Sequence, residues 1–167
     1  MNSTTDLSAR SAPWSPLKAI LVGGFLAGLA DMTYAIVWFS GVKHVPAIRV
    51  PQSVAGGLIG KSSFDGGAAT AILGLGLHWL IAFIWTTIFV VAAVRLLPAL
   101  RRTPFLSGLA YGAWIYFFMY WVVLPLDAMH TQPHIHPLDT WLTGLAVHMF
   151  AIAQAISWSA AKTAPAG

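Results

Sequence analysis

Four long apolar runs constrain this chain more than any other feature of its sequence. They cover about residues 17–41, 66–94, 105–124 and 138–161. Each run reaches the roughly 20 apolar residues that an α-helix needs to cross about 30 Å of hydrocarbon. Prolines and short polar stretches separate the runs, as expected for connecting loops. The sequence therefore predicts an all-α fold, a four-helix transmembrane bundle at 17–161, with a flexible polar segment at 1–16 and a flexible tail at 162–167.

The composition supports the same class of protein. Hydrophobic residues make up 57% of the chain, charged residues make up 8%, and Glu and Cys are absent. A soluble domain carries about a quarter charged residues, so most of this surface is expected to face the lipid bilayer. The Lys and Arg residues are scattered at the ends of the apolar runs and form no basic stripe, which argues against nucleic-acid binding. The absence of Cys excludes disulfides and thiolate metal sites.

The positive charges predict the orientation of the helices. If both termini are cytoplasmic, the inside holds Arg10, Lys18, Arg95, Arg101, Arg102 and Lys162, and the outside holds Lys43, Arg49 and Lys61. Cytoplasmic loops carry the excess of Lys and Arg in membrane proteins. The sequence therefore favours cytoplasmic N- and C-termini.

Two matching elements indicate an internal repeat. The first run contains Phe-Leu-Ala-Gly-Leu-Ala at 25–30, and the third contains Phe-Leu-Ser-Gly-Leu-Ala at 105–110. The second and fourth runs share a Gly-x-x-x-His element, Gly74 to His78 and Gly144 to His148. This order predicts two similar helical hairpins in the same membrane orientation, a parallel repeat. Chance similarity between Leu-, Ala- and Gly-rich helices is the alternative.

The glycine spacing is typical of close helix packing. Small residues four positions apart let membrane helices approach each other. The glycines assigned to packing on this basis are Gly24, Gly28, Gly74, Gly108, Gly112 and Gly144. The same faces could hold a homo-oligomer together.

Three ionisable residues, Asp31, His78 and His148, fall in the middle parts of predicted spans. A charge there costs at least about 2.5 kcal/mol on insertion scales, so such side chains face the bundle interior or a cavity. They form the candidate intramembrane polar site. The histidines could hydrogen-bond backbone carbonyls and stabilise the bundle, relay protons with Asp31, or ligate a haem iron or a transition metal.

A second cluster lies between the third and fourth runs. It contains three histidines and two aspartates within a short loop, Asp127, His130, His134, His136 and Asp139. These side chains are ligands for Zn, Cu or Ni, so the loop is a candidate metal site. The alternative is a solvated loop, because prolines split the run and no His-Glu-x-x-His spacing is present.

One further motif does not fit the sequence around it. The segment 55–62 resembles a phosphate-binding loop, but Ala55 stands where that motif needs Gly, and no buried strand precedes it. Residues 50–59 are instead predicted to form a short amphipathic helix on the outer surface of the bilayer. Without Glu, Cys or a Ser/His/Asp arrangement, the sequence predicts a protein that is not an enzyme.

Residues 52–67, together with Gly108-Leu-Ala-Tyr-Gly112 and Val122-Val-Leu-Pro125-Leu126, carry a resemblance to known proteins. About residues 18–160 resemble a family of small bacterial four-helix inner-membrane proteins, and more distantly the YagU-like proteins. The resemblance implies a multi-pass protein of the bacterial inner membrane and brings no activity, cofactor or catalytic residue.

Two functions are expected on these grounds. The first is a structural or accessory membrane component, or a small-solute or proton pathway through Asp31, His78 and His148. The second is a metal- or haem-binding redox or sensor protein that uses His78 with His148, or the histidine loop.

Overall fold

The computed structural model describes residues 12–133, 135 and 137–164, and this part of the chain is helical throughout its length apart from short connections. Four helices are long and apolar enough to cross a membrane. Their bounds are Pro16–Val42 (27 residues), Gly67–Leu96 (30 residues), Pro104–Leu126 (23 residues) and Leu138–Ala161 (24 residues). The predicted all-α class and the four apolar spans are therefore confirmed.

Each long helix contains a π-helical segment, in which hydrogen bonds close wider turns. α1 (Pro16–Ile36) continues as Val37–Val42, α3 (Gly67–Val91) as Ala92–Leu96, and α5 (Pro104–Phe118) as Met119–Val123 and then α6 (Leu124–Leu126). The last long helix is α7 (Leu138–Val147), the π-helical segment His148–Ile152 and α8 (Ala153–Ala161). Between the long helices lie α2 (Arg49–Ile59), a 3-10 turn at Gly60–Phe64, and α4 (Ala99–Arg102).

Local sequence sets where these helices begin. Ser15 precedes Pro16, and its hydroxyl accepts a hydrogen bond from the Lys18 amide at 3.2 Å. This is the usual N-cap arrangement followed by proline in the first turn. Pro104 likewise opens α5, because proline lacks the amide hydrogen that the first helical turn leaves unpaired.

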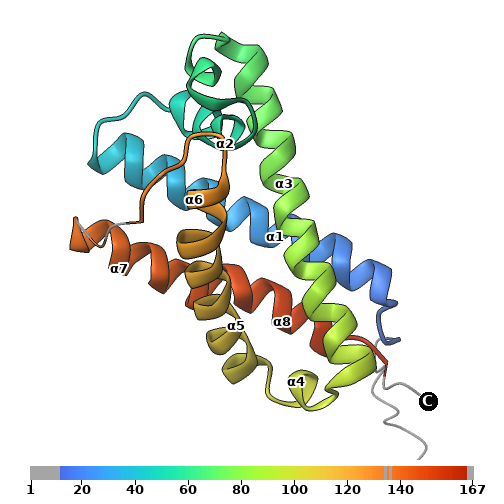
Figure 1. Cartoon of the computed structure of the whole chain (residues 1–167). Coiled ribbons are helices and arrows are strands. Elements are labelled where there is room, and N and C mark those ends of the chain that lie inside the picture. Colours follow the sequence, from blue (N-terminus) through green and yellow to red (C-terminus); the bar gives the residue numbers. More distant parts are fainter. Residues whose placement is uncertain (1–11, 134, 136, 165–167) are drawn as a thin grey trace, which may run out of the picture.

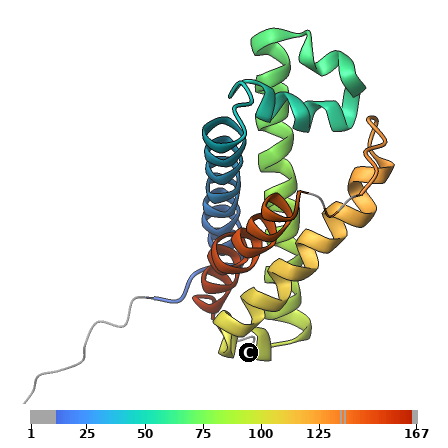
Figure 2. The same cartoon turned by 90° about the vertical axis from the view of Figure 1, so that its left-hand side faces the viewer.

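Side-chain size explains how the long helices pack. α1 lies along α8 (Figure 1), and a methyl group at Gly23 would lie only 3.0 Å from the Ser159 Cβ. α3 and α5 instead meet through large side chains, with Tyr111 donating to the Trp85 carbonyl at 2.7 Å and packing its ring, tilted, against that of Phe89. Small residues bring the first pair together, whereas aromatic rings hold the second pair apart. Figure 2 shows α5 and α6 leaning away from α3.

The two ends of the molecule differ. One end carries residues 12–15, residues 162–164 and α4, and is called the terminal side; the other carries α2 and is called the α2 side (Figure 1). On the α2 side, Lys43 forms an ion pair with Asp139 at 2.7 Å. The Trp38 indole donates to Thr140, and Tyr34 is hydrogen-bonded to Thr143. These contacts join the end of α1 to the start of α7.

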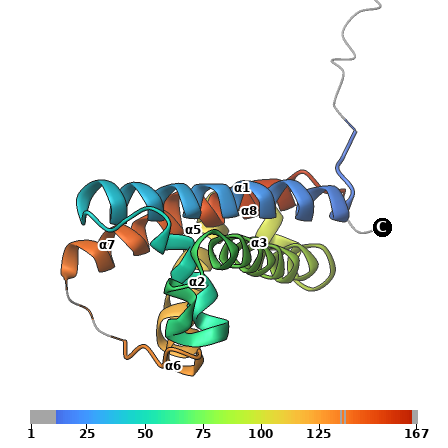
Figure 3. The same ribbon diagram turned by 90° about the horizontal axis from the view of Figure 1, so that it is seen from above.

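The sequence predicts a short amphipathic helix at 50–59, and the structure has α2 at Arg49–Ile59 with one face buried and the other exposed; its position on the outer surface of the bilayer stays a prediction. α2 packs across α3 (Figure 3), and a methyl group at Gly74 would overlap the Pro51 carbonyl. Gln52 is 2% exposed and donates to the Gly67 carbonyl at 3.0 Å and to Thr70 at 3.3 Å. α2 is therefore held against α3 by a glycine contact and a buried amide.

The six glycines assigned to packing contact neighbouring segments of the same chain. A methyl group would meet the Phe83 ring at Gly24, the Trp79 indole at Gly28, Gln154 at Gly108 and the Tyr116 ring at Gly144. At Gly112 it would overlap the His148 carbonyl. These glycine faces are covered within one chain, so a homo-oligomer would need a different surface.

Candidate functional site

Two cavities meet at Asp31 and His78. The inner cavity has a volume of about 190 Å³, and the outer cavity, nearer the α2 side, has about 390 Å³. Asp31, His78 and Val54 line both. Asp31 comes from α1, His78 from α3 and Val54 from α2, so the junction lies where these three helices converge.

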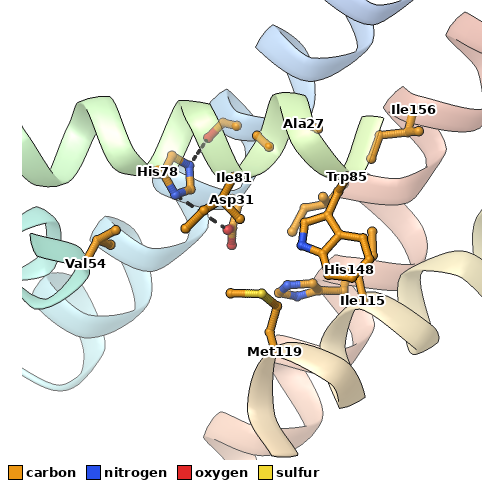
Figure 4. A pocket seen from close by; sticks show the side chains of 13 residues that line it. Ala27, Asp31, Val54, His78, Ile81, Trp85, Ile115, Met119, His148 and Ile156 are labelled. Carbon is orange, nitrogen blue, oxygen red and sulfur yellow. Dashed lines mark hydrogen bonds and ion pairs between the residues drawn. The ribbon is translucent and has the colours of Figure 1, made fainter. Parts of the chain in front are cut away.

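The two ring nitrogens of His78 face different groups. Its Nε2 lies 2.8 Å from the Gly28 carbonyl oxygen, and its Nδ1 lies 4.0 Å from the Asp31 carboxylate (Figure 4). A carbonyl oxygen can only accept, so Nε2 carries the hydrogen and Nδ1 faces the carboxylate. The interpretation that a histidine here bonds a backbone carbonyl across a helix interface agrees with this contact.

Asp31 and His78 place two groups that can exchange protons opposite each other. A carboxyl group can carry a proton, and the Nδ1 lone pair of His78 can accept one. The Asp31 side chain is 32% exposed and the His78 side chain 11%, and both residues line the two cavities. The pair is therefore a candidate for proton handling.

Arg49 lies on the outer cavity without neutralising Asp31. Its guanidinium stacks on the Phe64 ring at 5.2 Å. The ion pairs found among the described residues are Lys43–Asp139 and His78–Asp31. Asp31 therefore has a titratable partner and no permanently charged one within the described chain.

His148 lines the inner cavity opposite the pair (Figure 4). Its Nδ1 donates to the Gly144 carbonyl of its own helix at 2.8 Å, which leaves the Nε2 lone pair without a hydrogen bond in the part of the chain that the structure describes. Tyr116 packs against the ring edge at 5.1 Å. The backbone of His148 lies against Gly112, where an added methyl group would overlap the His148 carbonyl. His148 is also the first residue of the π-helical segment His148–Ile152. Such segments are frequent at functional sites.

An apolar cluster closes the inner cavity towards the terminal side. It consists of buried side chains from α1, α3, α5 and the last helix: Ala19, Ala27, Phe89, Val90, Ala93, Ile115, Ile152, Ile156 and Ala160. Ala27, Ile115, Ile152 and Ile156 also line the inner cavity. Packed hydrocarbon therefore separates the polar groups from the terminal side.

Sequence reasoning missed the contribution of α2 and of two large side chains. Val54 and Ser53 from α2 line the outer cavity, and Trp85 and Met119 line the inner one. Aromatic and Met residues are common in any apolar helix, so the presence of Trp85 and Met119 in the sequence does not indicate that they line a cavity. The only indication in the sequence was Gly74, whose lack of a side chain admits α2.

The histidine loop stays a prediction as a metal site, because His134 and His136 lie outside the described residues. Asp139 is engaged by Lys43 and accepts from the Thr140 amide at 2.7 Å. Asp127 accepts from the Met129 amide at 2.8 Å, and His130 Nδ1 lies 3.4 Å from the Pro125 carbonyl. Among the residues that the structure describes, no three His, Asp, Glu or Cys side chains gather as metal ligands.

A haem or metal between His78 and His148 also stays a prediction. Only His148 offers a free Nε2 lone pair. His78 uses Nε2 for the Gly28 carbonyl, and its Nδ1 faces Asp31. A shared ligand would therefore require His78 to give up its contact with α1.

Compared with known proteins, the chain matches no family model, no curated protein and no solved structure. The resemblance to small bacterial four-helix inner-membrane proteins stays a prediction. The fold by itself shows an all-α chain with four helices long and apolar enough to span a membrane.

Proposed function

We propose that this chain is a multi-pass protein of the bacterial inner membrane that conducts protons, alone or with a small solute, through the cavities at Asp31 and His78. The observation that carries this proposal is the position of the Asp31–His78 pair at the junction of the two cavities. Ionisable residues at such positions mark ion or proton pathways in membrane proteins. The proposed activity is transport and not catalysis, as the sequence also leads us to expect.

The geometry supports a pathway that is open on one side. A proton arriving from the α2 side passes the outer cavity and reaches the pair. From there it can pass to His148, whose free Nε2 lone pair faces the inner cavity. Passage to the terminal side requires the apolar cluster to separate. The described arrangement is therefore one state of a gated pathway, closed by hydrocarbon on the terminal side.

The proposed orientation places the terminal side in the cytoplasm, as the basic residues favour. The two-hairpin repeat is part of the same proposal and is supported by matched contacts. Gly28 packs on Trp79, the residue after His78, and Gly112 packs on His148 and Met149. The two hairpins are not identical in their packing: small side chains bring α1 close to α8, whereas aromatic rings separate the equivalent pair, α3 and α5.

Proton flux in proteoliposomes tests the proposal. The purified full chain is reconstituted with a pH-sensitive dye inside, and a valinomycin-induced potassium potential drives proton entry. We expect flux above protein-free vesicles, reduced at least tenfold in Asp31→Asn and in His78→Ala. The matched controls are Asp65→Asn and His44→Ala, both exposed residues outside the cavities. Flux that is equal in the site variants and the controls would remove the basis of the proposal.

One observation favours a second candidate, a metal- or haem-binding membrane protein. The free Nε2 lone pair of His148 lies in the inner cavity with Met119 beside it (Figure 4), and imidazole with thioether suits haem iron or copper. Metal analysis by mass spectrometry and a visible spectrum, on untagged protein purified without chelators, decide this. Near-stoichiometric iron or copper that is lost in His148→Ala would establish it; metal-free protein would exclude it.

A further inference from the structure

The charges of the described residues are distributed unevenly between the two ends of the molecule. The α2 side holds both signs, with Asp65, Asp127 and Asp139 near Lys43, Arg49 and Lys61. The terminal side holds cations alone among the described residues, namely Lys18, Arg95, Arg101, Arg102 and Lys162. Since no described carboxylate compensates them, these cations form a positive patch at one end of the bundle.

Two of these cations lie next to the ring of Trp14. The Lys18 Nζ lies 4.9 Å from the centre of the Trp14 ring, and the Lys162 Nζ lies 4.5 Å from it. The two ammonium groups are therefore within about 10 Å of each other, which is about one Debye length at 0.1 M salt. They repel each other at this separation, and an anion bound near both would reduce the repulsion.

Backbone contacts fix this arrangement. The Trp14 amide donates to the Lys162 carbonyl at 2.8 Å. Arg101 donates to the Thr163 carbonyl at 3.3 Å and to the Ala164 carbonyl. These bonds tie the segment after α8 to the start of α1 and to α4. The two lysines are thus brought together by three separate parts of the chain.

A cavity of about 360 Å³ opens beside this cluster, lined by Trp14, Lys162 and Thr163 with the neighbouring backbone. In the first two turns of α1, which follow Trp14 in the chain, Leu17 is 64% exposed and Leu21 is 52% exposed, four residues apart and so on one face of the helix. Exposed apolar side chains in the same turns as Lys18 match a molecule with an anionic head and a hydrocarbon tail. Trp14 also has the position expected of an interfacial aromatic residue at the end of a membrane span.

We infer that Trp14, Lys18 and Lys162 form a binding site for the phosphate headgroup of an anionic phospholipid. The acyl chains would lie along Leu17 and Leu21 of α1. The site is separate from the Asp31–His78 cavities and does not depend on the proposed proton pathway. A basic residue near the surface of an anionic membrane contributes roughly 5-fold in affinity, so the two lysines together account for roughly 25-fold.

Native mass spectrometry of the delipidated full chain tests this site. The chain is titrated with phosphatidylglycerol and with phosphatidylcholine of the same acyl chains. We expect at least tenfold tighter binding of the anionic lipid. The double variant Lys18→Gln/Lys162→Gln should bind both lipids equally, and the charge-matched control Lys43→Gln/Lys61→Gln on the α2 side should keep the preference. The preference of the unmodified chain should also fall steeply as salt is raised from low to high ionic strength.

Three outcomes would overturn the inference. Equal binding of the two lipids by the unmodified chain would show that no anionic-lipid site exists. A preference retained in Lys18→Gln/Lys162→Gln would place the site elsewhere. Full displacement of the bound lipid by an equal concentration of inorganic phosphate would show a free-anion site rather than a lipid site. The salt dependence decides the question even if the double variant does not fold.

Discussion

Nδ1 of His78 lies 4.0 Å from the Asp31 carboxylate while Nε2 of the same ring is bonded to the Gly28 carbonyl. The imidazole thus links α1 to α3 by one nitrogen and presents the other to the acidic group in the cavities. His78 therefore has both a structural contact and a proposed role in proton transfer. The variants of His78 are therefore expected to affect both stability and proton handling, whereas other cavity variants should separate the two.

The first prediction concerns the stability of the α1–α3 contact. His78→Ala removes the donor to the Gly28 carbonyl, and the loss of one partner from a buried hydrogen bond costs roughly 1–3 kcal/mol. His78→Gln, whose amide can donate to the same carbonyl, should recover part of this loss. Unfolding of the detergent-solubilised protein in a denaturant titration measures both. An unchanged free energy of unfolding in His78→Ala would contradict the contact.

His148 is expected to behave differently. Its hydrogen bond goes to Gly144 of its own helix, so His148→Ala breaks no contact between helices. Its unfolding free energy should fall by less than that of His78→Ala, in the same denaturant titration. Proton flux should nevertheless fall, because the free Nε2 lone pair is lost. A stability loss equal to that of His78→Ala would show that His148 acts mainly as a structural residue.

The third prediction separates two glycines of α3. Gly74→Ala places a methyl group on the Pro51 carbonyl, which forces α2 away from α3, and overpacking of this kind costs roughly 1–3 kcal/mol. At Gly76 no atom lies within 4 Å of an added methyl group. Gly76→Ala should therefore be neutral or stabilising by up to about 1 kcal/mol through helix propensity. Thermal unfolding compares the two, and equal effects would contradict the placement of α2.

Access to the cavities can be mapped by cysteine labelling, since the chain contains no Cys. Val54→Cys, at the junction of both cavities, should react with a membrane-impermeant thiol reagent added from the α2 side. Ala93→Cys, at a position that is 0% exposed in the apolar cluster, should react only after denaturation. Labelling of Val54→Cys from the terminal side instead would reverse the direction in which the pathway opens.

The sequence predicts most of the fold because length and hydropathy decide which segments can cross a bilayer. The expected run at 66–94 and the observed helix Gly67–Leu96 differ only at their ends. The position of α2 could not be predicted in this way. An 11-residue helix is too short to span a membrane, and whether it lies on lipid or on protein depends on the Pro51–Gly74 contact, which is tertiary.

The candidate site was partly predictable for a similar reason. A charged group inside the membrane is costly, so Asp31, His78 and His148 were expected to face the interior, and the structure places all three on the cavities. The hydrogen-bond partners of the two histidines were not predictable. They depend on where the Gly28 and Gly144 carbonyls lie relative to each ring. The apolar cluster on the terminal side was not predictable either. It depends on how Ala, Ile and Val side chains pack together, and these residue types are common in every span.

The proposed pathway requires Asp31 to take up and release a proton, and infrared difference spectroscopy detects this at the carboxyl group itself. The reconstituted protein is examined as the pH on the α2 side is changed, and the carbonyl stretch of a protonated carboxyl group is followed. We expect a band that appears or disappears with pH, is absent in Asp31→Asn and is altered in His78→Ala, but is unchanged in Asp65→Asn. A spectrum with no such band, or with a band that survives in Asp31→Asn, would rule out Asp31 as the proton carrier.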